Sequence, residues 1–253
     1  MKVIFLGTGT SQGVPVIACK CDVCVSDDLK DKRLRSSVYI QIGQKKWVID
    51  SGPDFRQQML RAKVLKLDAI LFTHEHKDHT AGLDDVRSYN YLQKKSMPIY
   101  AEERVLESIQ KEFSYIFLNK TYPGIPKIEL NIIENKAFDI QGEKIIPIRG
   151  MHYHLPVFAY RIRNFAYITD VNFISEEEQE KLKGLDVLIV NALRKEKHVS
   201  HFNLVEALDL IKKVKPKKAY LTHISHFLGK HKEISKELPD NVFLAYDGLE
   251  IDL

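Results

Sequence analysis

The sequence predicts an α+β protein in which two mixed β-sheets pack together and carry helices on their outer faces. Short apolar runs rich in β-branched and aromatic residues recur along all 253 residues, and segments with helical periodicity fall between pairs of them. The composition, 44% hydrophobic and 28% charged, is that of a globular chain. A disordered or fibrous protein is therefore excluded.

The strands are expected where short apolar runs end in polar or turn residues. These runs cover 2–6, 37–42, 46–50, 68–72, 128–133, 144–148, 157–162, 165–169, 185–190, 218–222 and 242–246. Apolar spacing of three and four residues predicts helices over 54–63, 79–93, 102–113, 175–183, 202–214 and 229–236. No composition shift, repeat or low-complexity stretch marks a boundary, so residues 1–253 are expected to form a single domain.

The charged residues are spread along the chain and give a net charge of +4. This balance permits nucleic acid as a partner without favouring it, and it leaves a homodimer open. No run approaches the ~18 apolar residues of a membrane span, and the apolar start is too short for a signal peptide, so a cytoplasmic protein is expected. The lysines of 212–218 predict a solvated face, whereas 30–35 is left between a surface loop and a substrate contact.

The segment 71–79 concentrates metal-ligand residues directly after a predicted buried strand and before a predicted helix. It places His74, His76, Asp78 and His79 in the pattern His-x-His-x-Asp-His. Neutral imidazole and carboxylate are ligands that Zn²⁺ and Mn²⁺ accept, and a loop at a strand end directs several of them into one cavity. The spacing therefore predicts a metal site rather than isolated core or surface histidines.

Three cysteines lie within six residues, at Cys19, Cys21 and Cys24. An odd number cannot close a disulfide framework, and such a cluster is typical of a metal site in a reducing compartment. The alternative is three reduced, buried thiols. A metal site would need a fourth ligand.

The motif at 74–79 resembles the signature of the metallo-β-lactamase superfamily at every position. That family has an αββα four-layer sandwich of two mixed sheets flanked by helices, which is similar in element order to the one predicted here. The resemblance implies two active-site divalent metal ions, Mn²⁺ or Zn²⁺, with a water or hydroxide between them. Their ligands would be His74, His76 and His152 for one ion, Asp78, His79 and His223 for the other, and Asp170 between the two.

Two of these positions carry alternatives. His152 and His154 both stand in 151–156, and we favour His152 because related sequences place a basic, non-ligand residue two positions later. Asp50 matches the family's second-strand aspartate, which supports the metal loop from behind. It could equally cap a turn.

Further motifs resemble the PhnP-type cyclic-phosphate phosphodiesterases of this superfamily. They are 7–15, the cysteine trio, the segment 222–226 and the segment 247–251. By this resemblance His226 joins Cys19, Cys21 and Cys24 on one structural zinc, and His201 protonates the leaving group, unless it only N-caps the helix 202–214. His198 is left between a phosphate contact and a loop residue, and His231 is expected on the surface.

The function implied is that of a metal-dependent phosphodiesterase acting on a small cyclic phosphate or nucleotide-like diester. The two metal ions would lower the pKa of a bridging water toward ~7 for in-line attack. Asp78, as a metal ligand, and His201, as general acid, are the expected catalytic residues, since a histidine with a pKa of ~6.5 suits proton transfer at neutral pH.

Three alternatives stay open. A ribonuclease of the tRNase Z type would share the metal motif, but its RNA-binding arm is longer than the one candidate insertion, 118–127. A thioester or lactam hydrolase would use the same metals on a carbonyl. A non-catalytic, zinc-stabilised binding domain would need only the cysteine site.

Overall fold

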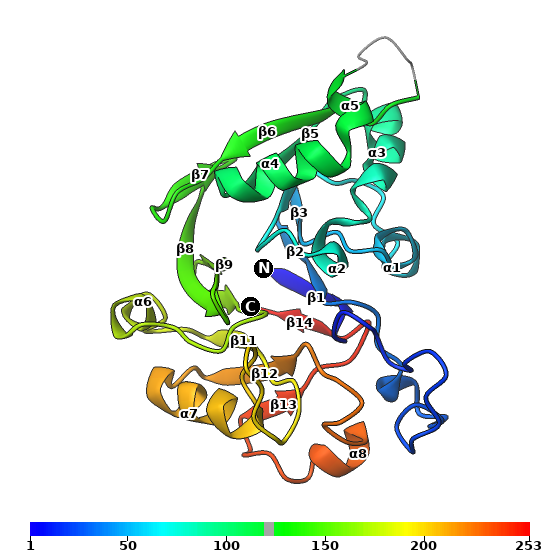
Figure 1. Cartoon of the computed structure of the whole chain (residues 1–253). Coiled ribbons are helices and arrows are strands. Elements are labelled where there is room, and N and C mark those ends of the chain that lie inside the picture. The colour runs from blue at the N-terminus through cyan, green and yellow to red at the C-terminus, as the bar shows by residue number, and fades with distance from the viewer. Residues whose placement is uncertain (119–123) are drawn as a thin grey trace.

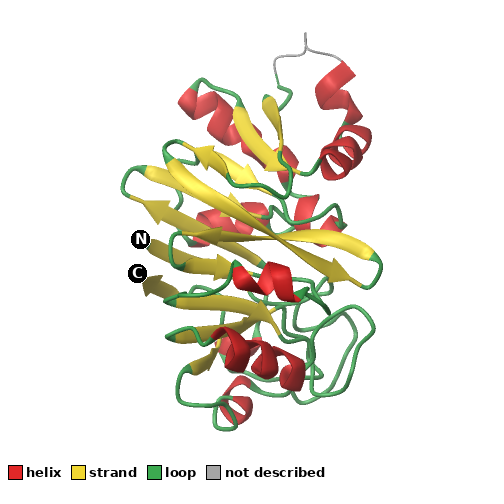
Figure 2. Ribbon diagram, turned by 90° about the vertical axis from the view of Figure 1, so that its left-hand side faces the viewer, coloured by secondary structure: helices red, strands yellow, loops and turns green. Residues whose placement is uncertain are grey.

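Two seven-stranded sheets pack face to face in the computed structural model, which describes residues 1–118 and 124–253 (Figures 1 and 2). The strands of the first sheet are, in spatial order, β14 (Glu250–Asp252), β1 (Lys2–Gly7), β2 (Ser37–Ile42), β3 (Lys45–Ile49), β4 (Ala69–Leu71), β5 (Met97–Ala101) and β6 (Ile128–Ile132). Those of the second are β13 (Val242–Leu244), β12 (Lys218–Thr222), β11 (Val187–Asn191), β10 (Phe165–Tyr167), β9 (Leu155–Ile162), β8 (Glu143–His152) and β7 (Phe138–Ile140). Both sheets mix parallel and antiparallel pairs, as predicted.

The alternation of side chains along the strands builds the layers. In β1, Val3 and Phe5 belong to the core between the two sheets, whereas Ile4 and Leu6 belong to a second core beneath helices. Strands of the second sheet divide in the same way between the central core and a third core on their outer face. The four-layer αββα sandwich is therefore confirmed.

Helices cover both outer faces (Figure 1). The first sheet carries α1 (Phe55–Arg61), α2 (Lys77–Thr80), α3 (Arg87–Gln93), α4 (Glu103–Glu112) and α5 (Ser114–Leu118) in the connections between its strands. The second carries α6 (Glu176–Glu180), α7 (Leu204–Val214) and α8 (His231–Ile234), and two 3₁₀ turns span Leu29–Asp31 and Leu83–Val86. Among the described helices, none combines the length and the apolar composition needed to cross a bilayer.

The predicted helix over 79–93 is broken into three pieces. The break falls at Gly82, whose N–H donates to the carbonyl of Ser51 at 2.8 Å instead of continuing a helix. A Cβ at Gly82 would lie 2.1 Å from the carbonyl oxygen of Gly52, so only glycine allows this close approach. The segment after the histidine motif is thereby held against the loop that follows β3.

Two expectations about charged segments have different outcomes. The lysines of 212–218 are exposed, as predicted. Arg33, in the run that was open between surface loop and substrate contact, is neither: it is buried and donates to Thr8 Oγ1 at 2.8 Å and to the carbonyl of Ala245 at 2.6 Å. Arg33 therefore ties the N-terminal segment to the end of the chain.

Candidate metal centre

The candidate ligands follow strand ends at one edge of the sandwich. Asp50 and His223 come directly after the last residues of β3 and β12, and Asp170 lies three positions after the end of β10; their φ angles are +64°, +53° and +55°. This left-handed backbone is uncommon for residues other than glycine and is found where a functional site fixes it. The turn it makes at each strand end directs the side chain into the shared edge.

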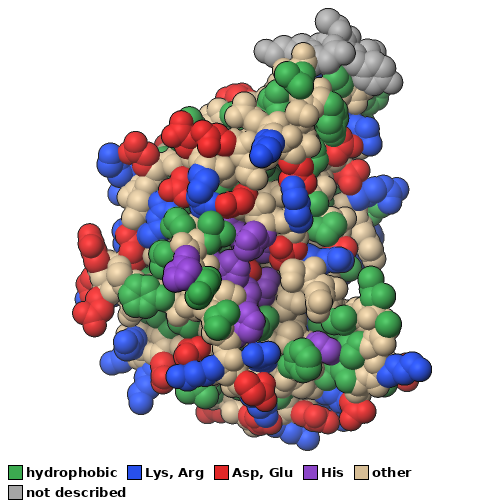
Figure 3. Space-filling model, viewed as in Figure 1, with side chains coloured by type: hydrophobic (Ala, Val, Ile, Leu, Met, Phe, Trp, Pro, Cys, Tyr) green, Lys and Arg blue, Asp and Glu red, His purple; other side chains and the backbone are tan. Residues whose placement is uncertain are grey.

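The histidine motif occupies the loop between β4 and α2 and the first turn of that helix. His74 and His79 are buried, while His76 is exposed at the mouth of the site. His74 Nε2 and His76 Nδ1 are 3.1 Å apart. Figure 3 shows a group of histidine side chains in a hollow at the centre of this face, with hydrophobic and charged side chains around it and other histidines set apart from the group.

Asp50 supports this loop from behind. Its buried carboxylate accepts hydrogen bonds from the Thr73 N–H and hydroxyl, both at 2.9 Å, and from His79 Nδ1 at 2.8 Å. Because the Nδ1 proton of His79 is committed to Asp50, the lone pair of its Nε2 faces the opposite way. Asp50 therefore orients a candidate ligand rather than capping a turn.

The donor set around His79 fits a cation. His79 Nε2 is buried without a hydrogen-bond partner and lies 3.2 Å from Asp78 Oδ2 and 3.2 Å from Asp170 Oδ2. Burial lowers the pKa of His79, yet the carboxylates of Asp78, Asp170 and Asp50 outweigh it and raise that pKa well above its ordinary value. A buried point where carboxylates and an imidazole nitrogen meet requires positive charge, which a divalent ion supplies.

Asp170 lies between two sets of ligand atoms. His223 Nδ1 is 3.1 Å from Asp170 Oδ2. Ligand atoms lie within 4.8 Å of one another in the groups His74–His76–His152, His74–His79–Asp170 and Asp78–Asp170–His223. The seven residues predicted for the dimetal centre thus converge, with Asp170 shared between sets as a bridging carboxylate would be.

Of the two candidate histidines at 151–156, the structure brings only His152 into these sets. Its Nδ1 donates to the carbonyl of Ser200 at 2.8 Å, which leaves the lone pair of Nε2 for a metal. His154 is exposed and packs on the ring of Tyr153, with 3.7 Å between ring centroids.

His201 is buried against the ligands. Its ring centroid lies 4.6 Å from that of His152 and 4.8 Å from that of His223, and its Nδ1 is 3.7 Å from Asp170 without a hydrogen-bond partner. Burial is the main reason that the pKa of His201 falls to about 3, so its imidazole is neutral in the pocket.

The alternative role of His201 as an N-cap is wrong. Helix α7 begins after Asn203, whose side chain accepts from the N–H of Glu206 at 2.8 Å in a reciprocal capping box. His201 is therefore free of any capping duty.

Two other histidines had no firm role. His198 lies beside His201, with 5.2 Å between ring centroids, and its Nδ1 faces the N–H and hydroxyl of Ser200. His231, expected on the surface, is instead buried, with its Nδ1 3.4 Å from the guanidinium of Arg33. The lysines on either side of His231 led to the wrong prediction, because its burial depends on Arg33, which is 198 positions away in the chain.

The cysteine trio converges on His226. The three thiol sulfurs, of Cys19, Cys21 and Cys24, lie 3.4, 3.3 and 3.5 Å from His226 Nδ1. A tetrahedral zinc with ordinary Zn–S and Zn–N bonds separates such atoms by about 3.6 Å, so the four side chains fit that ion. Burial raises the pKa of Cys21, but hydrogen bonds from the Cys24 N–H and His226 outweigh it and lower that pKa to about 6.

A serine at Cys21 is expected to remove this ion while sparing the histidine centre. The melting temperature should fall by about 5 °C or more and the zinc content by about one ion per chain, because a closed site of this kind stabilises the fold. Calorimetry and elemental analysis measure both. Loss of turnover in protein that is still folded would contradict a purely structural role for the cluster.

A network of ion pairs holds the loop that carries the histidine motif 74–79, and the sequence did not predict this network. Glu75, between two candidate ligands, contacts the guanidinium of Arg104 on α4. Arg104 also donates to the carbonyl of Pro156 at 2.6 Å. Glu102 accepts both guanidinium nitrogens of Arg149, at 2.9 and 2.6 Å, and also pairs with Arg104. Local sequence patterns do not predict these ion pairs, because the partners lie far apart in the chain.

Replacing Arg104 by alanine is expected to weaken metal binding at the histidine centre by roughly 10–100-fold, the usual effect of losing support behind a ligand. Competition with a chelating dye measures this affinity. Arg87→Ala, at the start of α3, removes a surface pair with Asp84 of the preceding 3₁₀ turn and is the matched control. Equal metal affinity in the Arg104 and Arg87 variants would show that the network does not hold the loop.

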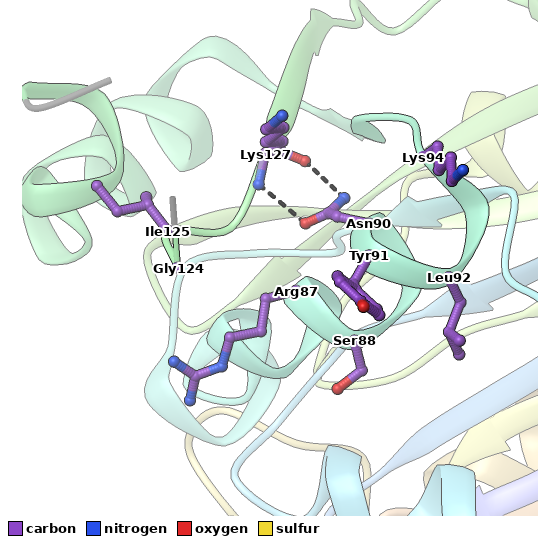
Figure 4. Close-up of a pocket in the computed structure, with 9 residues that line it drawn as sticks. All are labelled: Arg87, Ser88, Asn90, Tyr91, Leu92, Lys94, Gly124, Ile125 and Lys127. Carbon is purple, nitrogen blue, oxygen red and sulfur yellow. Dashed lines mark hydrogen bonds between the residues drawn. The ribbon is translucent and has the colours of Figure 1, made fainter. Parts of the chain in front are cut away.

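A cavity of about 670 Å³ lies between α3 and the segment 124–127, apart from the candidate metal centre (Figure 4). It shares no lining residue with the groups of candidate ligands. Its cationic side chains, Arg87, Lys94 and Lys127, point in different directions, and Asn90 is fully engaged with the backbone of Lys127 (Figure 4). The described residues that line this cavity therefore form no cluster of catalytic groups.

The sandwich and the seven converging candidate ligands are typical of a metallohydrolase, and comparison with known proteins identifies the family. The sequence model described as “Beta-lactamase superfamily domain” matches residues 46–224, so the chain belongs to the metallo-β-lactamase superfamily. Within it, the chain is similar to a crystal structure described as a new diphosphatase from the PhnP family. The two share 39% identity and a TM-score of 0.93, over 100% of this chain and 97% of that one.

Two curated relatives extend the comparison. An octanoyltransferase from Porphyromonas gingivalis is 41% identical over 253 residues, which cover 99% of this chain and 51% of that protein. The chain thus spans about half of that relative's length. A ribonuclease Z from Bacillus licheniformis is 28% identical over 167 residues, covering 64% of this chain and 49% of that one.

Proposed function

We propose that the chain is a metal-dependent phosphodiesterase that hydrolyses a small cyclic phosphate or a nucleotide-like diester. The observation that carries this proposal is His201, a buried imidazole set against the candidate ligands and bonded to none of them. A thioester expels a thiolate, which leaves readily as the anion, whereas cleavage of an alkyl diester expels a basic alkoxide that must be protonated.

In this proposal the ligands His74, His76, His152, Asp78, His79, His223 and Asp170 hold two divalent ions. Such ions, when bound, lower the pKa of water and neutralise charge on the phosphoryl oxygens. Water would add to phosphorus and lose a proton, the P–O bond on the opposite side would break, and protonated His201 would give its proton to the departing oxygen. The proton lost by water balances the one that His201 donates, so each cycle consumes one water and restores the protonated imidazole. A negatively charged phosphate beside His201 would raise the pKa of this imidazole and so favour the protonated form that donates.

The similarity to a PhnP-family diphosphatase supports phosphoryl chemistry over carbonyl chemistry. The octanoyltransferase relative is about twice as long, so its name does not locate acyl transfer in the half shared with this chain. A ribonuclease function rests on a shorter match, and part of its candidate arm, residues 119–123, lies outside the described residues. The cysteine site, proposed to hold one structural zinc, serves stability in every case.

A substrate panel tests the proposal. Cyclic nucleotides, linear diesters, monoesters, an octanoyl thioester, a β-lactam and a precursor tRNA are assayed with added Mn²⁺ or Zn²⁺. We expect turnover of small diesters to exceed that of every other class and to vanish with a chelator. Preference for the thioester, the lactam or the tRNA would overturn the assignment in favour of the corresponding alternative.

A further inference from the structure

A cavity of about 280 Å³, which we call the edge cavity, lies at the outer strand of the second sheet. Strand β13 lines it with Val242, Phe243 and Leu244, and α8, at the same end of the molecule (Figure 1), contributes His231. Lys30, from the 3₁₀ turn at 29–31, lines it as well. The edge cavity shares no lining residue with the groups of candidate metal ligands, so a ligand could bind there without contacting those groups.

His231 offers a buried donor to the edge cavity. The residue is 8% exposed, and its Nδ1 lies 3.4 Å from Nη2 of Arg33. An arginine side chain donates and never accepts, so Nδ1 is the acceptor and the ring proton is on Nε2. The hydrogen bonds of His231 to described residues involve Nδ1 and the backbone, and leave Nε2 without a partner. A donor in so buried a residue is stabilised by an acceptor, which a ligand in the cavity would supply.

The charge of the lining favours an anion. Lys30 Nζ lies over the ring of Tyr246, 4.6 Å from its centroid, and no carboxylate is among the described lining residues. The nearby carboxylates of Asp28 and Asp31 accept the backbone N–H groups of Lys30 and His231, at 2.9 and 2.7 Å. The polar atoms that remain for a ligand therefore include one cation and one N–H donor, which together suit a negatively charged acceptor.

Aromatic rings form much of the remaining wall. Phe243 stacks on Tyr220 with 5.3 Å between ring centroids and is 40% exposed. Tyr246 meets the ring of His231 at 84°, with 5.7 Å between centroids. Flat aromatic groups pack on such rings face to face or edge to face. The volume is at the lower end of the range for small-molecule sites, so a ligand with a single ring fits best.

We propose that the edge cavity binds a small aromatic carboxylate, with its ring against Phe243 and Tyr246 and its carboxylate toward Lys30 Nζ and His231 Nε2. Two donors match the two oxygens of a carboxylate, and a planar ring uses the aromatic wall. An aliphatic acid would leave that wall without a stacking partner, and a neutral ring would leave the lysine without a counter-charge. The proposal does not rest on the proposed hydrolysis.

Titration of benzoate into the zinc-loaded protein, followed by backbone amide NMR, tests the proposal. We expect saturable shifts at the amides of 29–31 and 242–246, with a Kd of about 1 mM or below, a strength open to a ligand of so few atoms. Benzamide keeps the ring and removes the charge, and acetate keeps the charge and removes the ring. Each should bind at least roughly 10-fold more weakly than benzoate.

Two variants identify the side chains. Lys30→Gln removes the cation and Phe243→Ala removes the exposed ring, and each should raise the Kd for benzoate roughly 10-fold. Both side chains are exposed, so the variants are expected to fold. The matched controls are Lys232→Gln, on α8 outside the lining, and Tyr91→Ala, on the exposed face of α3. Both controls should bind benzoate as the wild type does.

Unchanged benzoate binding in Lys30→Gln and Phe243→Ala would overturn the proposal. Shifts confined to the histidine motif 74–79 would also overturn it, because the carboxylate would then bind at the metal centre. Benzamide or acetate binding as tightly as benzoate would refute the joint need for ring and charge. The absence of saturation up to about 20 mM benzoate would show that the edge cavity is not a site for this class of ligand.

Discussion

The Asp78→Ala variant is expected to lose diester hydrolysis by at least about 10³-fold. Asp78 lies 3.2 Å from His79 Nε2 and shares a group of ligand atoms with Asp170 and His223. Its removal takes a charged ligand from one of the two proposed ions, and stabilisation by such an ion is worth several kcal/mol in the transition state. Steady-state assays, with metal content measured on the same samples, record both effects.

The control for this variant is Asp209→Ala, which removes an exposed carboxylate from α7. It should keep the rate and the metal content of the wild type. Full metal content and rate in Asp78→Ala would disprove the dimetal centre. Loss of rate with all metal retained would instead make Asp78 a group that acts on the substrate.

The His201→Ala variant should lose roughly 10²–10⁴-fold in kcat on a diester with a poor alkoxide leaving group, which is the range for a positioned general acid. The aryl oxide of an aryl diester leaves without protonation, so the same variant should lose far less kcat on that substrate. Comparison of the two substrates measures the role of His201 directly. Because His201 holds no cap on α7, the variant is expected to fold.

Metal content serves as the internal check on His201→Ala. It should equal that of the wild type, because His201 is not among the proposed ligands. An equal loss on alkyl and aryl diesters would refute proton donation, and a lower metal content would make His201 a ligand, which its place beside His152 and Asp170 would then explain.

Local patterns were sufficient to predict most of the fold. The apolar run 2–6 predicted a strand, and the structure forms β1 there, with Val3 and Phe5 between the sheets and Ile4 and Leu6 beneath helices. The sequence patterns did not predict β5, β7 and β14, because these strands are short or contain polar and proline residues. They form through hydrogen bonds to the neighbouring strands of each sheet. The break at Gly82 was also unpredictable, because it depends on the loop that follows β3.

The residues of the candidate site also differ in how far the sequence predicts them. The ligands of the motif 74–79 could be found from spacing, and the distant ones only through resemblance to a family. The contact between Glu75 and Arg104 and the burial of His231 against Arg33 leave no trace in local spacing, since each joins segments that only the folded chain brings together. Sequence therefore identified the candidate ligands and one group that supports them, Asp50, whereas the structure was needed for the contacts of Glu75 and His231.

Metal content per chain, measured by elemental analysis of the folded protein after loading and removal of free ions, tests the dimetal centre most directly. About three divalent ions per chain are expected, two at the histidine and aspartate ligands and one at the cysteine site. About one ion per chain, lost in Cys21→Ser, would contradict a dimetal hydrolase and leave a zinc-stabilised binding domain.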